Sequence, residues 1–287
     1  MIRGELNTST MASSVGHDTN NADLLITSKT DINRADEDEG KAFLLASKNG
    51  DDKIVELLIS GGADINHVNN EGWDALMIAS RNSHDKVVKL LITSGADIKR
   101  VDTDGQDALM RASNKGHEKV VELLINSGAD FKRVDKDGQD ALMRASKKGH
   151  EKVVELLINS GANFKRVDND GWDALMYASD KGHEKVVKLL INSGANFKRV
   201  DTYGQDALMR ASNKGHEKVV ELLINSGANF KRVDNDGWDA LMYASDKGHE
   251  KVVKLLINSG ANFKRVDTYG RDALMRASQK GHEKSYL

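Results

Sequence analysis

Apolar residues occur in two short blocks in each stretch of 33 residues, and the unit from 105 to 137 shows both blocks. In the first block Ala108, Leu109 and Ala112 recur at the spacing of one helix face, which predicts a short helix over 108–114. In the second block, the apolar residues from Val120 to Ile125 cover too wide an arc for a helix that packs on one side only. The pattern therefore predicts a second helix from about 117 to 126, covered on both flanks as in a stack of repeats.

Polar residues and glycines mark the ends of both helices. Asp107 precedes the first helix, where its carboxylate can accept hydrogen bonds from the free amides of the first turn. Gly116 and Gly128 can take the positive φ that ends a helix. Residues 131–135 then lead in an extended conformation into an Asp-Gly turn at 137–138, which predicts a β-hairpin turn.

This unit recurs along most of the chain. Glycines at 72, 105, 138, 171, 204, 237 and 270 are each 33 residues apart, and seven complete units are predicted over 39–269. The segment 163–204 recurs unchanged at 229–270, so a block of two units has been duplicated. Such a period is typical of a solenoid, in which each repeat packs only on its neighbours.

The two ends of the chain depart from the unit. Residues 1–22 are polar and are predicted to be disordered, and residues 23–38 are predicted to form a degenerate, more polar half-repeat that caps the stack. The last unit, 270–287, reads Ser285-Tyr286-Leu287 where the second helix should continue, so it is predicted to be truncated. We expect a monomer that can associate through this uncapped end.

The unit resembles the ankyrin repeat, and the resemblance covers about residues 23–287. The family motif Thr-Pro-Leu-His-x-Ala reads Asp-Ala-Leu-Met-x-Ala here, while the Gly-His before the second helix is kept at Gly116-His117. The resemblance implies an all-α ankyrin-repeat solenoid, built from helix–turn–helix units with β-hairpin turns. Because Met replaces the family's His, we expect an intact fold with a more apolar seam between repeats.

Composition and charge exclude several classes of protein. The 42 Lys and Arg residues nearly balance the 44 Asp and Glu, so no net field favours nucleic acid or a membrane. There is no cysteine, which removes thiolate zinc sites and a cysteine nucleophile. Neither a signal peptide nor a membrane span is recognisable, so the expected location is cytoplasmic, with the nucleus left open.

Candidate catalytic and metal-binding motifs do not hold up. Histidines at 84, 117, 150, 183, 216, 249 and 282 recur one repeat apart, roughly 8–10 Å if neighbouring helices pack normally, which is too far to share a zinc ion. We expect them to be structural. The runs Asp168–Gly171 and Asp234–Gly237 resemble a calcium loop, but Tyr177 and Tyr243 stand where the bidentate Glu is needed. We therefore expect no catalytic residue, no metal and no cofactor.

Comparison of the copies shows which positions the fold leaves free. Change concentrates at the turn, just after the glycine and in the middle of the first helix, and in ankyrin proteins this surface is a groove that grips partners. The candidate partner-binding residues are Trp73, Arg111, Arg144, Trp172, Tyr177, Tyr203, Arg210, Trp238, Tyr243, Tyr269 and Arg276. A structural alternative stays open, because Trp172 and Tyr177, like Trp238 and Tyr243, have the spacing of a hydrophobic staple.

The function that the resemblance implies is a non-catalytic scaffold that binds a protein partner in this groove. The alternative is that the array regulates or targets a larger signalling enzyme or channel of which this chain is a fragment. On the second helices Glu155, Lys188, Glu221 and Lys254 alternate in sign, which predicts a ladder of exposed ion pairs with no function of its own.

Overall fold

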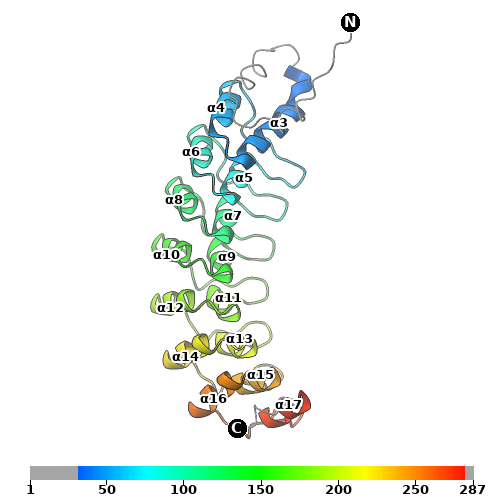
Figure 1. Cartoon of the computed structure of the whole chain (residues 1–287), viewed down its shortest axis with the longest axis vertical. Coiled ribbons are helices and arrows are strands. Elements are labelled where there is room, and N and C mark those ends of the chain that lie inside the picture. Colours follow the sequence, from blue (N-terminus) through cyan, green and yellow to red (C-terminus); the bar gives the residue numbers. More distant parts are fainter. Residues whose placement is uncertain (1–31, 282–287) are drawn as a thin grey trace. The chain divides into compact units, whose positions relative to one another are not determined.

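The computed structural model describes residues 32–281. This part of the chain contains fifteen α-helices and no β-strand (Figure 1), which confirms the predicted all-α class. The predicted disordered segment 1–22, the first residues of the predicted half-repeat, 23–31, and residues 282–287 lie outside the described residues.

The helices alternate between the first and the second helix of each repeat. The first helices are α3 (Ile32–Asn49), α5 (Ala75–Arg81), α7 (Ala108–Lys115), α9 (Ala141–Lys148), α11 (Ala174–Asp180), α13 (Ala207–Lys214), α15 (Ala240–Asp246) and α17 (Ala273–Gln279). The second helices are α4 (Asp52–Ser60), α6 (Asp85–Thr93), α8 (Glu118–Asn126), α10 (Glu151–Asn159), α12 (Glu184–Asn192), α14 (Glu217–Asn225) and α16 (Glu250–Asn258).

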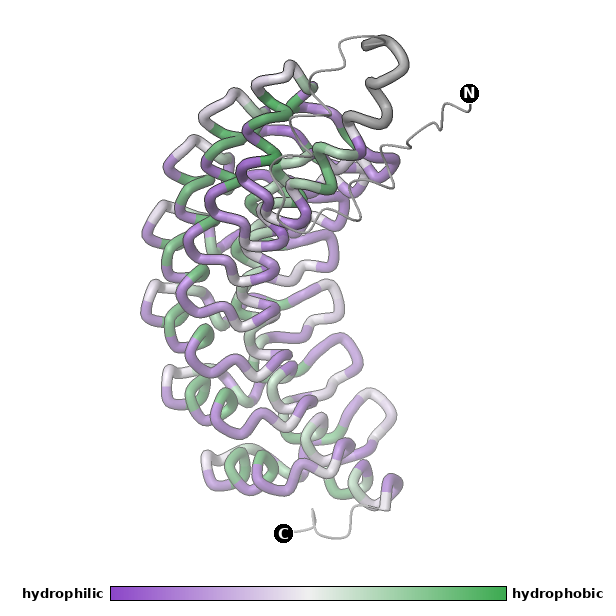
Figure 2. Tube along the Cα trace, turned by 45° about the horizontal axis from the view of Figure 1, so that its top comes forward, coloured by the Kyte–Doolittle hydropathy of each residue, from purple (hydrophilic) through white to green (hydrophobic). Residues whose placement is uncertain are grey.

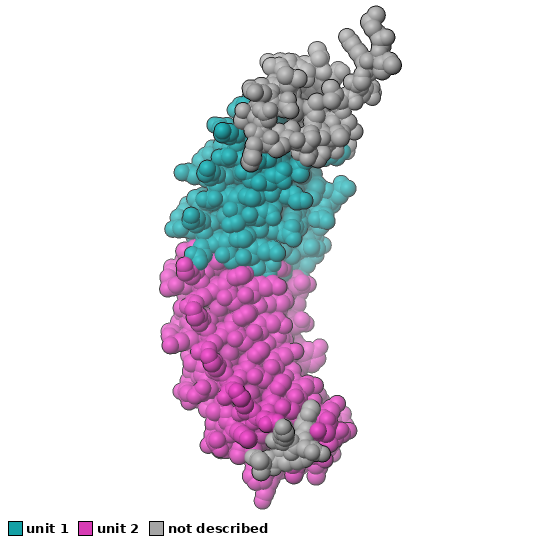
Figure 3. Space-filling model, in the orientation of Figure 1, with its two compact units in different colours: residues 1–136 teal, residues 137–287 magenta. Residues whose placement is uncertain are grey.

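The described residues belong to two compact units, one up to Lys136 and one from Asp137 onward (Figure 3). In the first unit, α3, α5 and α7 pack in series, and α4, α6 and α8 form a parallel series of contacts. In the second unit the same holds for the first helices α9 to α17 and for the second helices α10 to α16. Each helix therefore contacts its own partner and its counterparts in neighbouring repeats, as the wide apolar arc predicts.

Apolar side chains fill the seam between repeats, and hydrophobic stretches follow the helices of each unit (Figure 2). Leu175 and Met176 are each 1% exposed, and Val186, Val187 and Leu190 of the second helix are fully buried. The methionine in place of the family's histidine thus lies in the apolar seam, as expected. It fits there because its thioether is flexible and carries no group that demands a hydrogen bond.

An aspartate caps the first helix of every repeat from 72 onward. The carboxylate of Asp173, whose backbone is extended, accepts a 2.9 Å hydrogen bond from the Met176 amide. The same bond forms from Met110 to Asp107 and from Met242 to Asp239. The aspartate therefore replaces the family's threonine as the N-cap, as the sequence predicts.

The segment between a second helix and the next first helix, here called the finger, is closed by a turn and not by paired strands. In the finger that ends at Trp172, the Asp168 amide donates to the Trp172 carbonyl at 2.9 Å. Gly171, at φ +82°, lies so close to the next finger that a Cβ would be 3.1 Å from the Asp201 Cα, so only glycine fits there. The predicted hairpin turn is therefore present as a turn alone, without strands in the described fingers.

Neighbouring fingers are joined by one backbone hydrogen bond each. The amide of Thr202 donates to the carbonyl of Asp170 at 3.1 Å, and the amide of Asn235 donates to Tyr203 at the same distance. The acceptor is the backbone carbonyl of the residue at the tip of each turn, so the bond does not depend on the side chain of that residue.

The first described helix differs from the predicted organisation. We expected a repeat boundary between residues 38 and 39, but α3 runs through it from Ile32 to Asn49. The physical reason lies in the sequence: Glu39 replaces the turn glycine, and Lys41 replaces the capping aspartate. Without a residue for positive φ and without a cap, nothing stops the helix from extending toward the N-terminus.

At the other end, α17 is the first helix of the last predicted unit, and the predicted loss of its second helix falls outside the described residues. Leu274 and Met275 are 51% and 52% exposed, whereas their counterparts Leu241 and Met242 are each 1% exposed. Association through this end stays a prediction.

The capping aspartates make stability depend on pH. Burial raises the pKa of Asp107, Asp140, Asp173 and Asp206 to about 6, although hydrogen bonds from backbone amides and a nearby arginine oppose the shift. The ordinary pKa of an aspartate side chain is 3.8, so between these two values the folded protein holds protons that the unfolded chain has released. Each cap therefore loses part of its contribution to stability as the pH rises from about 4 to about 6.

Replacing all four of these aspartates with asparagine should remove this dependence, because asparagine still accepts the capping bond but does not titrate. Between pH 4.5 and pH 7 the free energy of unfolding of the parent should fall relative to that of the variant, by on the order of 1–3 kcal/mol per aspartate. Urea unfolding at the two pH values measures this difference. Both proteins carry the same histidines, so any contribution of the histidines to the pH dependence cancels. Parallel pH profiles for the two proteins would show that the caps stay charged.

Candidate partner-binding site

Six of the seven described fingers contain a buried aspartate at the base, and this finger-base aspartate organises the surface at which binding was predicted; the first described finger has Asn69 there. Its six copies are 5–7% exposed: Asp102, Asp135, Asp168, Asp201, Asp234 and Asp267. In Asp168, Oδ1 accepts from the amides of Asp170 at 3.0 Å and of Trp172 at 2.8 Å. One carboxylate oxygen thus holds the turn.

The other carboxylate oxygen binds the fourth residue of the first helix. The Tyr177 hydroxyl donates to Oδ2 of Asp168 at 2.5 Å, and Tyr243 donates to Asp234 at the same distance. Burial raises the pKa of Tyr177, and the bond to Asp168 raises it further, so the phenol keeps its proton and remains a donor.

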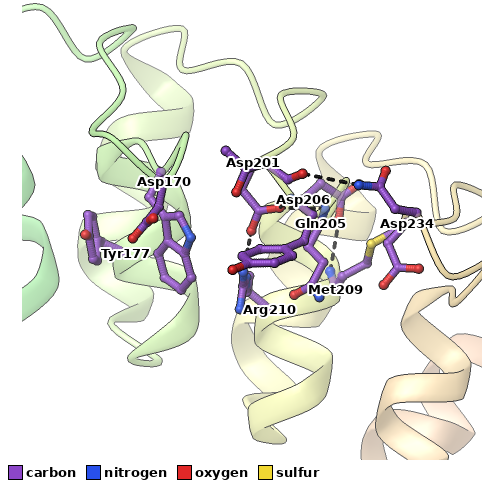
Figure 4. Close-up of polar contacts among 12 residues, drawn as sticks. Asp170, Tyr177, Asp201, Gln205, Asp206, Met209, Arg210 and Asp234 are labelled. Carbon is purple, nitrogen blue, oxygen red and sulfur yellow. Dashed lines mark hydrogen bonds and ion pairs between the residues drawn. The ribbon is translucent and has the colours of Figure 1, made fainter. Parts of the chain in front are cut away.

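In other repeats an arginine takes the place of the tyrosine. Arg111 forms an ion pair with Asp102, Arg210 with Asp201 and Arg276 with Asp267. Figure 4 shows Arg210 of α13 reaching Asp201 at the base of its finger. A buried carboxylate needs a donor at this point, and tyrosine or arginine supplies it.

The same helix residue also contacts the preceding repeat, at the position just after the turn glycine. Where that position holds tryptophan, the next repeat holds an arginine over the indole ring: Arg111 lies 3.3 Å from the Trp73 centroid, Arg210 lies 4.1 Å from Trp172, and Arg276 lies 3.9 Å from Trp238. These distances are within the range of a cation–π interaction.

In the second unit, the glutamine at this position contacts a tyrosine of the next repeat in two cases. Gln139 Nε2 donates to the Tyr177 hydroxyl at 2.7 Å, and Gln205 donates to Tyr243 at 2.6 Å. The tyrosine hydroxyl therefore accepts a hydrogen bond from the glutamine of the preceding repeat and donates one to the finger-base aspartate of its own repeat. Tryptophan pairs with arginine in all three cases and glutamine pairs with tyrosine in two, while Gln106 is followed by Arg144.

The comparison with protein families decides what kind of repeat this is. A family model described as "Ankyrin repeats (3 copies)" matches residues 10–102, 88–168, 109–201, 160–234 and 208–286, which together span most of the chain. The chain belongs to the ankyrin repeat family. Ankyrin repeats are generally protein–protein interaction modules and are typically not catalytic. A comparison with the curated proteins found no match.

The ankyrin fold places the predicted binding residues in three environments. Arg111, Tyr177 and Arg276 are each 7% exposed, so their side chains lie within the repeat stack. The predicted residues at intermediate burial are Trp73, Arg144, Trp172, Arg210, Trp238 and Tyr243. At the finger tips, in contrast, Tyr203 is 61% exposed and Tyr269 is 73% exposed.

The staple that was left open as an alternative is present. The ring centroids of Trp172 and Tyr177 are 5.0 Å apart, as are those of Trp238 and Tyr243. These aromatic pairs brace the start of the ankyrin first helix. The role of the finger-base aspartate was not predicted from the sequence, although its recurrence from Asp102 to Asp267 beside a changing helix residue was a usable signal.

Five of the repeat histidines join neighbouring repeats, as expected of a structural role, whereas His282 lies outside the described residues. Nε2 of His216 donates to the carbonyl of Asp180 at 2.9 Å, and Nε2 of His183 donates to Lys147 at 3.1 Å. Each bond ties the start of a second helix to the end of the first helix one repeat earlier. Within residues 32–281 no group of three or more His, Cys, Asp or Glu side chains could hold a metal ion.

In the same part of the chain no helix is both long and apolar enough to cross a membrane.

A double-mutant cycle tests whether the tryptophan–arginine contact couples neighbouring ankyrin repeats. We expect Trp172→Leu and Arg210→Met to show a coupling free energy of about 0.5–2 kcal/mol in urea unfolding, because each change removes the same cation–π contact. The matched control is Trp172→Leu with Arg276→Met, since Arg276 stacks on Trp238 instead. These two changes should be additive within about 0.5 kcal/mol. Equal coupling in both cycles would contradict the pairing.

Proposed function

We propose that this ankyrin array is a non-catalytic scaffold that holds a protein partner against its finger tips and first helices. The tip tyrosines Tyr203 and Tyr269 are the principal anchors. The exposure of these two tyrosines is the observation that carries the proposal.

The finger does not need tyrosine at its tip. The amide of Tyr203 donates to Asp201 at 2.9 Å, and the amide of Asp170, at the same position one repeat earlier, donates to Asp168 at 3.0 Å. Both tip carbonyls also accept from the next finger. Because the turn is the same with either side chain, the aromatic ring is available for binding.

Tyrosine suits this use. It offers a large, stiff contact surface with a polar end and is enriched among the residues that dominate binding energy. Tyr203 and Tyr269 are two repeats apart, roughly 16–20 Å at normal helix spacing, so an extended segment of about six residues could contact both. The Arg271 guanidinium, 4.8 Å from the Tyr269 ring centroid, holds that ring from one side.

Alanine at Tyr177 or Arg210 is a poor test, because either change leaves a finger-base aspartate without its donor. A better variant is Tyr203→Asp with Tyr269→Asp, which installs the residue that Asp170 and Asp236 already supply. A matched control is Lys188→Glu with Lys254→Glu on the second helices, which installs the residue of Glu155 and Glu221.

The experiment identifies partners of the full chain by proximity labelling and then measures the dissociation constant of each purified partner. We expect the tyrosine variant to bind about 30-fold more weakly or worse, in line with the loss of one strong anchor, while its unfolding midpoint stays unchanged. The lysine control should bind like the parent. Parent-like binding by a folded tyrosine variant would overturn the assignment of the tips.

A further inference from the structure

One position separates the four repeats of the second unit consistently from the repeats of the first unit. It lies two residues after the glycine that follows the second helix. The first unit has aspartate there, at Asp64, Asp97 and Asp130. The second unit has asparagine, at Asn163, Asn196, Asn229 and Asn262.

The fold does not require the charge at this position. Oδ1 of Asp97 accepts from the Lys99 amide at 2.9 Å, and Oδ1 of Asn163 accepts from the Lys165 amide at 3.0 Å. The same bond forms at Asn196 and Asn229. Since both residues close the same turn, the change to asparagine alters the surface charge and leaves the backbone as it is.

The result is a row of exposed lysines without acidic neighbours in the turn, here called the lysine row. It consists of Lys165, Lys198, Lys231 and Lys264. None of the four forms an ion pair with a described residue. The arginines that follow them are engaged elsewhere: Arg199 Nε lies 3.7 Å from the capping Asp173. The unit from Asp137 onward accordingly has 25 Lys and Arg against 21 Asp and Glu, while the unit up to Lys136 has 17 against 23.

Neighbouring members of the lysine row lie on adjacent fingers. Nη1 of Arg232 donates to the Lys198 carbonyl at 2.5 Å, which places consecutive repeats in direct contact at this row. Exposed valines accompany the lysines: Val200 is 39%, Val233 37% and Val266 51% exposed. The row therefore offers one positive charge and one small apolar surface per repeat.

We propose that the lysine row is a second docking surface, separate from the finger tips, and that it binds an extended acidic segment of a partner protein. Charge complementarity requires an acidic ligand. The spacing favours a peptide, because roughly 8–10 Å between repeats corresponds to about three residues of extended chain. In the polyproline II conformation, which has three residues per turn and rises about 9 Å over them, an acidic residue at every third position can face each lysine in turn.

The test is fluorescence anisotropy of the full chain with a labelled peptide that carries glutamate at every third position. The key variant is N163D/N196D/N229D/N262D, which restores the residue of the first unit at each turn. We expect it to bind the peptide at least tenfold more weakly than the parent, with an unchanged unfolding midpoint, because aspartate closes the same turn.

K188E/K254E is the matched control, since it changes the net charge by the same amount as the four asparagine substitutions but on the second helices. It should bind within about threefold of the parent, as should the tip variant Tyr203→Asp with Tyr269→Asp. Failure of the tip assignment and failure of the lysine row are therefore distinguishable.

Three results would overturn the proposal. The first is an absence of peptide binding by the parent. The second is an equal loss of binding in the asparagine variant and in K188E/K254E, which would reduce the effect to net charge. The third is tighter binding of a single-stranded RNA of equal charge that is lost in the asparagine variant, which would make nucleic acid the ligand.

Discussion

The buried carboxylate at the base of the fingers from Asp102 onward is the interaction on which the repeat surface depends. One oxygen of Asp168 holds the turn through two backbone amides, and the other holds the first helix through Tyr177. A buried carboxylate is costly unless its lone pairs are met, so the helix must supply tyrosine or arginine. That donor in turn needs a neighbour in the preceding repeat, which is Gln139 for Tyr177 and Trp172 for Arg210.

This dependence sorts the differences between copies into two kinds. Changes within the network are linked, because each tryptophan is followed by an arginine and Gln139 and Gln205 are each followed by a tyrosine, and they maintain the contact between repeats. Changes outside it are free of such links: the turn accepts aspartate or tyrosine at its tip, and aspartate or asparagine after the second helix, with the same hydrogen bonds. Only the second kind of change can be assigned to binding, which is why the tips and the lysine row carry the functional proposals.

The periodicity of the sequence predicts local structure well. Asp107 was expected as a cap and Gly116 as the helix end, and the first takes the capping bond while the second has φ +79°. Local signals fail where the partner lies in another repeat. Nothing near Gln139 indicates Tyr177, 38 residues on, because that contact depends on the offset of the stack. The ladder of exposed ion pairs on the second helices was likewise predicted at the wrong residues. It was expected between Glu155 and Lys188, but the ion pair between these two helices joins Lys185 and Glu151, at 3.3 Å.

Asparagine in place of the finger-base aspartate tests the central claim directly, in a tyrosine repeat and in an arginine repeat. Asp168→Asn keeps an acceptor for the turn and presents an amide that can donate to Tyr177, so we expect a loss of about 1–3 kcal/mol. Asp201→Asn presents the same amide to Arg210 and leaves a guanidinium without its counter-ion, so we expect about 3–5 kcal/mol. The measurement is urea unfolding of the two single variants at pH 7. A clearly larger loss in Asp201→Asn is the predicted result, and equal losses would contradict the account.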